Sequence, residues 1–168
     1  MEAAKGMADH VEKWISWVPG LGTYRDREKR RETDKKIREQ VAAGLQETRE
    51  GLKRTMLEFS RSGKGEILID LDHLSAQIQQ MADTIRFASY GYGGIFDLDK
   101  IREEEIHRLC SFDLALKEDA EKLQGKIGDI TPALSGEDLR RKILEAGAVV
   151  VSLQEKYRRR KNFMGRRA

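Results

Sequence analysis

Apolar residues recur every three or four positions through four long segments of this 168-residue chain. Between residues 67 and 89, for example, Leu71, Leu74, Ile78, Met81 and Ile85 follow one another in alternating steps of three and four. This spacing places the side chains on one face of an α-helix and does not fit the strict alternation of a half-buried strand. A chain with four such faces must bury them by packing helices against one another, which predicts an all-α fold.

Short breaks rich in Gly, Pro, Ser or Asp separate these segments and set the predicted domain organisation. The predicted helices span about 24–61, 67–89, 97–128 and 137–160. Because short connections favour antiparallel neighbours, residues 19–157 are predicted to form an elongated antiparallel four-helix bundle. An amphipathic helix over residues 1–18 precedes it, and a flexible basic tail over residues 158–168 follows it. Pro19 and Pro132, the only two prolines, both fall at breaks.

The first long segment has two unlike halves. From Ile37 to Phe59 its apolar residues keep the helical period, whereas Arg25–Lys36 contains no apolar side chain. That stretch holds seven basic and four acidic residues. Without an apolar face it cannot join a hydrophobic core, so we expect it to project beyond the core or to meet a charged partner.

Charge is distributed unevenly along the chain. The whole sequence has a net charge of +3, yet residues 156–168 contain seven Lys or Arg and no acid, so the remaining residues carry −4. A uniformly basic nucleic-acid-binding body is therefore excluded, but a basic terminal appendage is not. Six tail residues are candidate contacts for an anionic partner: Arg158, Arg159, Arg160, Lys161, Arg166 and Arg167.

Composition also bears on the compartment. The single cysteine excludes a disulfide framework and fits a reducing environment. The longest early apolar cluster, residues 14–18, is too short for a signal peptide, and mean hydropathy is −0.66. These features predict a cytoplasmic protein, which is also compatible with a peripheral position at the inner face of a membrane.

The sequence contains no assembled catalytic motif, so no catalytic, cofactor-binding or metal-binding residue is predicted. Glu104 and His107 form one Glu-x-x-His unit of the kind that holds a di-metal centre in helical bundles. The weaker second unit, Asp70 with His73, would lie about 9 Å away along the helix axis in an antiparallel hairpin. Cys110 follows Leu109 beside the apolar face of its segment and is predicted to be a buried structural thiol.

Aromatic residues outside the apolar faces are candidate contacts for a partner protein or a membrane. Trp14 and Trp17 lie on the predicted N-terminal helix, where Trp suits a membrane interface, although docking on the helical core explains them as well. Tyr90 and Tyr92 alternate with three glycines in a loop that either recognises a partner or caps the end of the core. At the start of the first long helix, the candidate contacts are Tyr24, Arg27, Arg30 and Arg31.

Several of these motifs resemble an uncharacterised bacterial protein family. The resemblance rests on Pro19–Tyr24 with the Arg-rich stretch behind it, on Tyr90–Asp97, and on Phe112–Leu116. It spans roughly residues 19–125 and leaves the N-terminal helix and the basic tail outside. The resemblance implies a bacterial, helical and non-enzymatic protein, and it supplies no activity, cofactor or catalytic residue.

Together these features favour a non-enzymatic helical scaffold or adaptor that binds other proteins, including a second copy of itself. A peripheral membrane protein that uses the Trp helix and the basic tail is the first alternative. Nucleic-acid binding through the tail is the second, and it would show a steep salt dependence.

Overall fold

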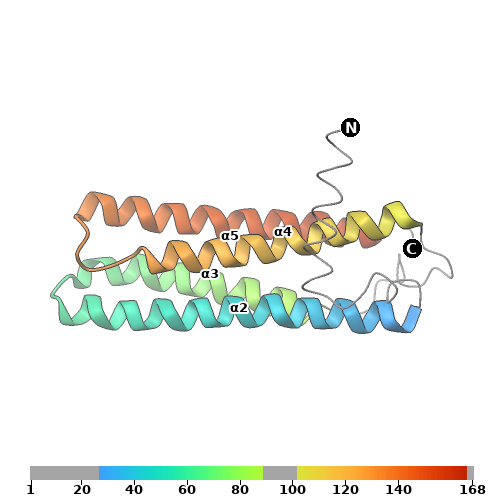
Figure 1. Cartoon of the computed structure of the whole chain (residues 1–168). Coiled ribbons are helices and arrows are strands. Elements are labelled where there is room, and N and C mark those ends of the chain that lie inside the picture. The colour runs from blue at the N-terminus through green and yellow to red at the C-terminus, as the bar shows by residue number, and fades with distance from the viewer. Residues whose placement is uncertain (1–26, 89–101, 166–168) are drawn as a thin grey trace.

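The computed structural model describes residues 27–88 and 102–165, and within these ranges all regular structure is helical. It contains α2 (Arg27–Arg61), α3 (Leu68–Arg86), α4 (Glu103–Gly128) and α5 (Gly136–Gly165), with a short 3-10 helix, η2 (Gly65–Ile67), ahead of α3. Figure 1 shows the four long helices lying side by side. The predicted all-α class is confirmed, whereas the predicted N-terminal helix over 1–18 lies outside the described residues.

Each long helix packs against two of the others. α2 contacts α3 and α4, and α5 contacts α4 and α3. At one end of the molecule the turn after α2 meets the turn after α4, where the Nζ of Lys64 donates to the carbonyl oxygens of Pro132 and Leu134 at 2.6 and 3.1 Å. We call this the turn end. The opposite end, where the start of α2 meets the last turns of α3 and α5, is called the network end (Figure 1).

Local sequence signals explain where the helices begin and end. α2 ends at Arg61, and two residues later Gly63 has a φ of +76°, in the left-handed region that glycine adopts without strain. At the start of α4, the backbone N–H of Arg102 donates to the Glu105 carboxylate at 3.0 Å. Ser135 precedes α5 and its hydroxyl oxygen accepts a hydrogen bond from the backbone N–H of Asp138 at 3.2 Å, which caps the start of the helix.

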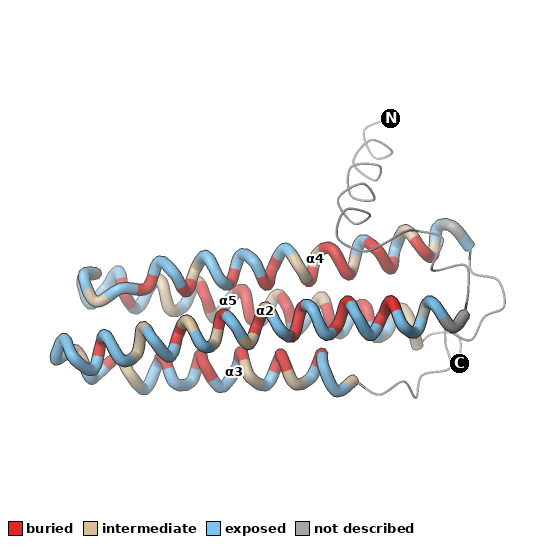
Figure 2. Tube along the Cα trace, turned by 60° about the horizontal axis from the view of Figure 1, so that its bottom comes forward, coloured by how far each residue is buried: buried red, intermediate tan, exposed pale blue. Residues whose placement is uncertain are grey.

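The apolar faces predicted from the spacing form the core. In Figure 2 the buried stripes of the four helices face one another, and exposed residues line the outside. The predicted positions that are buried include Leu45 and Phe59 of α2, Ile78 of α3, Leu123 of α4 and Leu153 of α5. Cys110 is buried as well, so its predicted burial beside the core is confirmed.

Two expectations about the charged segments are wrong. The sequence predicts a flexible tail from residue 158, but α5 continues as a helix to Gly165. The sequence also predicts that Arg25–Lys36 cannot bury a face and so projects beyond the core or meets a charged partner, but Thr33 and Asp34 are buried within the molecule. Both errors have one cause, because a buried ionic network joins these two segments and brings their charged side chains into the interior.

Candidate functional site on the network end and the outer face of α5

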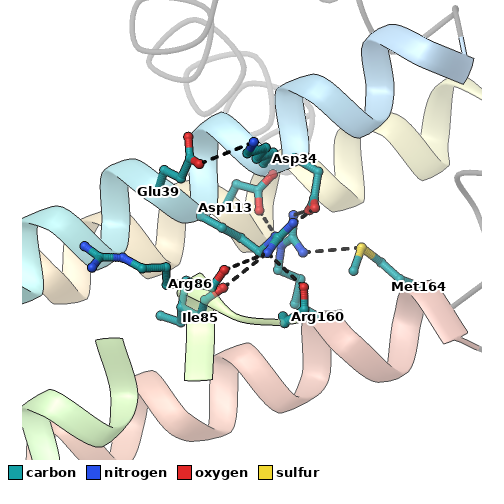
Figure 3. Close-up of polar contacts among 10 residues, drawn as sticks. Asp34, Glu39, Ile85, Arg86, Asp113, Arg160 and Met164 are labelled. Atoms are coloured by element: carbon teal, nitrogen blue, oxygen red, sulfur yellow. Dashed lines mark hydrogen bonds and ion pairs between the residues drawn. The ribbon is translucent and has the colours of Figure 1, made fainter. Parts of the chain in front are cut away.

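Arg160 is the centre of the network end. Its side chain is 1% exposed, and it lies between two buried carboxylates, Asp34 of α2 and Asp113 of α4 (Figure 3). Its Nη2 donates to Asp34 Oδ1 at 2.7 Å, and its Nε donates to Asp113 Oδ1. Nη1 is directed at the sulfur of Met164, one turn further along α5, at 3.3 Å. One guanidinium thus ties the C-terminal part of α5 to α2 and α4.

Arg38 extends the same network to α3. Its Nε donates to the second oxygen of Asp34, Oδ2, at 2.8 Å. Its Nη1 lies 3.1 Å from the carbonyl oxygen of Ala88 and 3.3 and 3.4 Å from those of Arg86 and Ile85. The last carbonyls of a helix have no partner within the helix, so a buried guanidinium satisfies them and is favoured by the helix dipole. Arg38 therefore closes the C-terminal end of α3.

The network is electrically balanced. Two arginines face two aspartates, and Asp113 is completely inaccessible to solvent. Among the described residues, each of these four charges therefore has a partner of opposite sign. Among the described residues, no three His, Cys, Asp or Glu side chains lie close enough together to hold a metal. We therefore assign the network a positioning role, because it fixes where the last turns of α5 lie.

Cys110 and His107 lie near the network on α4. Burial and the neighbouring Asp113 carboxylate both raise the pKa of the Cys110 thiol, which keeps the thiol protonated and unreactive. The Nδ1 of His107 is buried and has no hydrogen-bond partner.

The outer face of α5, which is turned away from the core, exposes several apolar residues. Leu144 is 74% exposed and Val151 is 53% exposed, and Ala148 between them is exposed too. These residues are four and three positions apart, so they lie on one side of the helix. The core positions Leu139, Ala146 and Leu153 occupy the opposite side. We call the exposed strip formed by Leu144, Ala148 and Val151 the α5 stripe.

The α5 stripe differs from the other exposed apolar residues because its members lie next to one another. Leu57 is exposed on α2, and Ile69 and Phe87 are exposed at opposite ends of α3. Single apolar residues of this kind are normal on protein surfaces, whereas a contiguous strip calls for an explanation.

A cavity of about 680 Å³ opens at the turn end between the starts of α3 and α5. Its charged rim is mixed, with Lys64 and Arg140 set against Glu66, Asp70 and Glu137. The ammonium group of Lys64 already donates to two backbone carbonyls. The cavity therefore offers no consistent charge that would select a ligand.

The basic tail residues differ in how exposed they are. Arg158, Arg159 and Lys161 are exposed on α5. Arg160 is buried, so its predicted role as a surface contact for an anionic partner is wrong, because its charge is neutralised by Asp34 and Asp113. The charge of Lys156 is also paired within the chain, since its Nζ lies 2.7 Å from Asp119 Oδ2. Arg166 and Arg167 lie outside the described residues.

All five aromatic contact candidates also lie outside the described residues. These are Trp14, Trp17, Tyr24, Tyr90 and Tyr92. Arg27 and Arg30 belong to α2, and Arg31 is exposed on that helix.

The network residues were not predicted from the sequence, although they occupy core-facing positions in the helical spacing. Tyr157 is the last apolar residue at core-facing spacing in its segment. Three residues further, at the next core-facing position, stands Arg160. Steps of four and three from Leu109 to Leu116 pass through Asp113, and similar steps back from Val41 pass through Arg38 and Asp34. A charge at a core-facing position signals a buried ionic partner, and four such charges of balanced sign predict a network.

Comparison of the chain with protein-family models, with curated proteins and with solved structures gave no match. The resemblance to an uncharacterised bacterial family therefore stays a prediction, and the functional argument depends on the geometry of this chain alone. In the part of the chain that the structure describes, no helix combines the length and the apolar character needed to cross a membrane.

Proposed function

We propose that this protein is a non-enzymatic helical scaffold that acts through protein–protein contacts, with the outer face of α5 as a contact surface. The observation that carries the proposal is the α5 stripe, in which Leu144 and Val151 expose most of their side chains on the helix face turned away from the core. Burying one such side chain in a complex would contribute about 1.5–3 kcal/mol. Solvent-exposed apolar residues of this kind are typical of protein-binding surfaces.

The way α5 is held supports this role. Arg160 anchors its C-terminal part to α2 and α4, and Lys156 pairs with Asp119 of α4 one turn earlier. Nearer the N-terminus of α5, Glu145 accepts from Lys126 of α4 at 2.6 Å. A helix fixed along its length presents its outer face without further ordering, which lowers the entropic cost of binding.

In this proposal the four helices form an elongated antiparallel bundle in the cytoplasm, and residues 1–18 form a further helix attached to it. The bundle is the rigid body of the scaffold. The N-terminal helix and the loop containing Tyr90 and Tyr92 are proposed as additional contact surfaces.

Photo-cross-linking in the cells that naturally produce the protein tests the proposal. A photoreactive amino acid at Ala148 should give an adduct of discrete mass that mass spectrometry identifies as one protein, and Val151→Lys should abolish it. The matched control carries the same photoreactive group at Ala76, an exposed alanine of α3. No discrete adduct at Ala148, or the same adducts at both positions, would contradict the proposal.

The exposed basic residues of α5 favour a second candidate function, which is contact with an anionic surface. Arg158 and Arg159 both face solvent near the end of the helix. A membrane with anionic lipids on its cytoplasmic face would attract them by about 1 kcal/mol per residue. Flotation with anionic vesicles at low salt, compared with Arg158→Gln/Arg159→Gln, tests this function, and equal flotation of the two proteins would exclude it. Salt-dependent binding of RNA or DNA in place of vesicles would indicate a nucleic-acid partner.

A further inference from the structure

The charged residues around the α5 stripe form a pattern that complements itself when its direction is reversed. Glu137, Leu144, Val151 and Arg158 are spaced by seven residues, so they share one side of α5. Arg140 and Glu155 lie next to this line. Read from the N-terminus of the helix, the order is acidic, basic, apolar, apolar, acidic, basic, at Glu137, Arg140, Leu144, Val151, Glu155 and Arg158.

We propose that a second copy of this chain docks on the outer face of α5, with the two α5 helices antiparallel. This arrangement sets Glu137 opposite Arg158 of the other copy, and Arg140 opposite its Glu155. Leu144 then meets Val151 across the interface. Each contact occurs twice because a two-fold axis passes near Gly147 and Ala148, as the isologous interface of a symmetric dimer requires.

The charge pattern also decides the direction of the pairing. A parallel pair would place each residue opposite itself, so Glu137 would face Glu137 and Arg158 would face Arg158. Every charged position of the strip would then repel its own copy, whereas the antiparallel pair turns every charged contact into an attraction. Binding to an unrelated partner would not require the charges of α5 to be complementary to one another, so the pattern favours a second copy.

The residues at the proposed axis allow the helices to approach closely. Gly147 has no side chain, and a Cβ built on it would meet no atom within 4 Å. Ala148 adds only a methyl group. Small residues at a helix crossing bring the backbones together, and the larger Leu144 and Val151 then pack on either side of the crossing. The contact would extend from Glu137 to Arg158, about 33 Å along the helix at 1.5 Å per residue.

The charged groups are available for these contacts. Glu137, Arg140 and Arg158 are exposed, and no ion pair is formed by any of the three among the described residues. Glu155 lies 3.7 Å from Arg159 of its own helix, and both side chains are more than half exposed. An exposed pair at that distance is weak, so Glu155 can turn towards the other copy.

The proposal rests on the proposed protein-binding function and names its partner. Sedimentation equilibrium of the full chain at low salt, over a concentration series, should show a reversible monomer–dimer equilibrium. Arg140→Glu should raise the dissociation constant about tenfold or more, because two attractions become two repulsions. Adding Glu155→Arg to that variant should restore dimerisation, because the exchanged charges meet again across the two-fold axis. The matched control, Arg54→Glu on the exposed surface of α2, should leave the equilibrium unchanged.

Single cysteines test the direction of the pairing. Ala148→Cys lies near the proposed axis and should form a disulfide-linked dimer under mild oxidation. Glu137→Cys should not, because the two copies of residue 137 would lie at opposite ends of the contact. The unsubstituted chain is the control, since its only thiol, Cys110, is buried. Cross-linking at both positions would indicate a parallel pair and overturn the proposal.

A monomer at every concentration tested would also overturn the proposal. The proposed scaffold function would survive that result if the photo-cross-link at Ala148 still captured one identified protein other than this chain, and still lost it with Val151→Lys. Failure of both measurements would reject the contact surface altogether. The two proposals therefore fail in distinguishable ways.

Discussion

The two ends of this protein are closed by opposite kinds of interaction. At the turn end Phe59, Ile67, Ile130 and Leu139 are buried, and the charged residues remain on the surface. At the network end the four helices meet around two arginines and two aspartates that solvent scarcely reaches. The same chain thus contains an apolar closure beside its short turns and an ionic closure where the helix ends are far apart in sequence.

This contrast indicates what each closure can specify. Apolar packing is not directional, and cores tolerate exchanges of similar volume. Buried ion pairs require particular partners, since a charge left without one is strongly destabilising. Short turns already fix the register of the helices at the turn end. At the network end Arg160 is separated from Asp34 by 126 residues, so we propose that the ionic contacts fix the register there.

The largest expected effect is at the network end. Arg160→Ala should lower the free energy of unfolding by about 3–5 kcal/mol, because two buried carboxylates would lose the cation that they share, although Asp34 keeps its contact with Arg38. Urea denaturation followed by circular dichroism measures this loss. The control is Arg159→Ala, whose side chain is 68% exposed, and the expected change there is within about 0.5 kcal/mol. A loss below about 1 kcal/mol for Arg160→Ala would mean that water solvates the two aspartates and that the network does not hold α5.

The apolar part of the fold was predictable from sequence, and the reason is physical. Spacing alone predicts the burial of Leu71, Ile78 and Leu123, because the helical period determines which side chains share the face that points inward. The thiol of Cys110 was placed correctly by the same rule. The α5 stripe was not foreseen, because Leu144 and Val151 lie off the core-facing line and the sequence does not say what covers them.

The network residues were missed because charge was treated as a sign of exposure. Arg160 sits in a run of basic residues, and that run concealed its position on the core face of the helix. Spacing gives the face of a residue, but only the fold shows that Asp34 and Asp113 reach the same point. A pairing over such a sequence separation depends on how four helices pack, which no single segment encodes.

A smaller effect is expected at the turn end. Leu139→Ala should lower the free energy of unfolding by about 2–3 kcal/mol, through the lost apolar contacts and the cavity that remains.

The reactivity of Cys110 towards a thiol reagent separates the two ends, because this thiol lies near Asp113. Arg160→Ala should speed the labelling of Cys110 in native conditions by opening the network end locally. Leu139→Ala should speed the labelling of Cys110 only in proportion to the loss of global stability. Equal local acceleration of labelling in both variants would contradict the inference that the two ends open independently.

The smallest expected effect concerns the surface charges of the turn end, and it depends on pH. A hydrogen bond from Lys142 lowers the pKa of Asp129, and one from Lys126 lowers the pKa of Glu145. A carboxyl group whose pKa is lowered by folding stabilises the fold above its unfolded pKa, about 3.9 for Asp and 4.3 for Glu, and this contribution is lost as the pH falls through the folded pKa.

Asp129→Asn combined with Glu145→Gln should therefore make the loss of stability between about pH 5 and pH 2 shallower. Added salt should shrink the difference, because the Lys142–Asp129 pair is exposed and the Lys126–Glu145 pair is only partly buried. Urea denaturation at a series of pH values measures this slope, with Glu47→Gln on the exposed surface of α2 as the control. An unchanged slope would place the acid sensitivity outside the turn end. In that case the apolar closure would be indifferent to pH, and the contrast between the two ends would extend from how they pack to how they respond to protons.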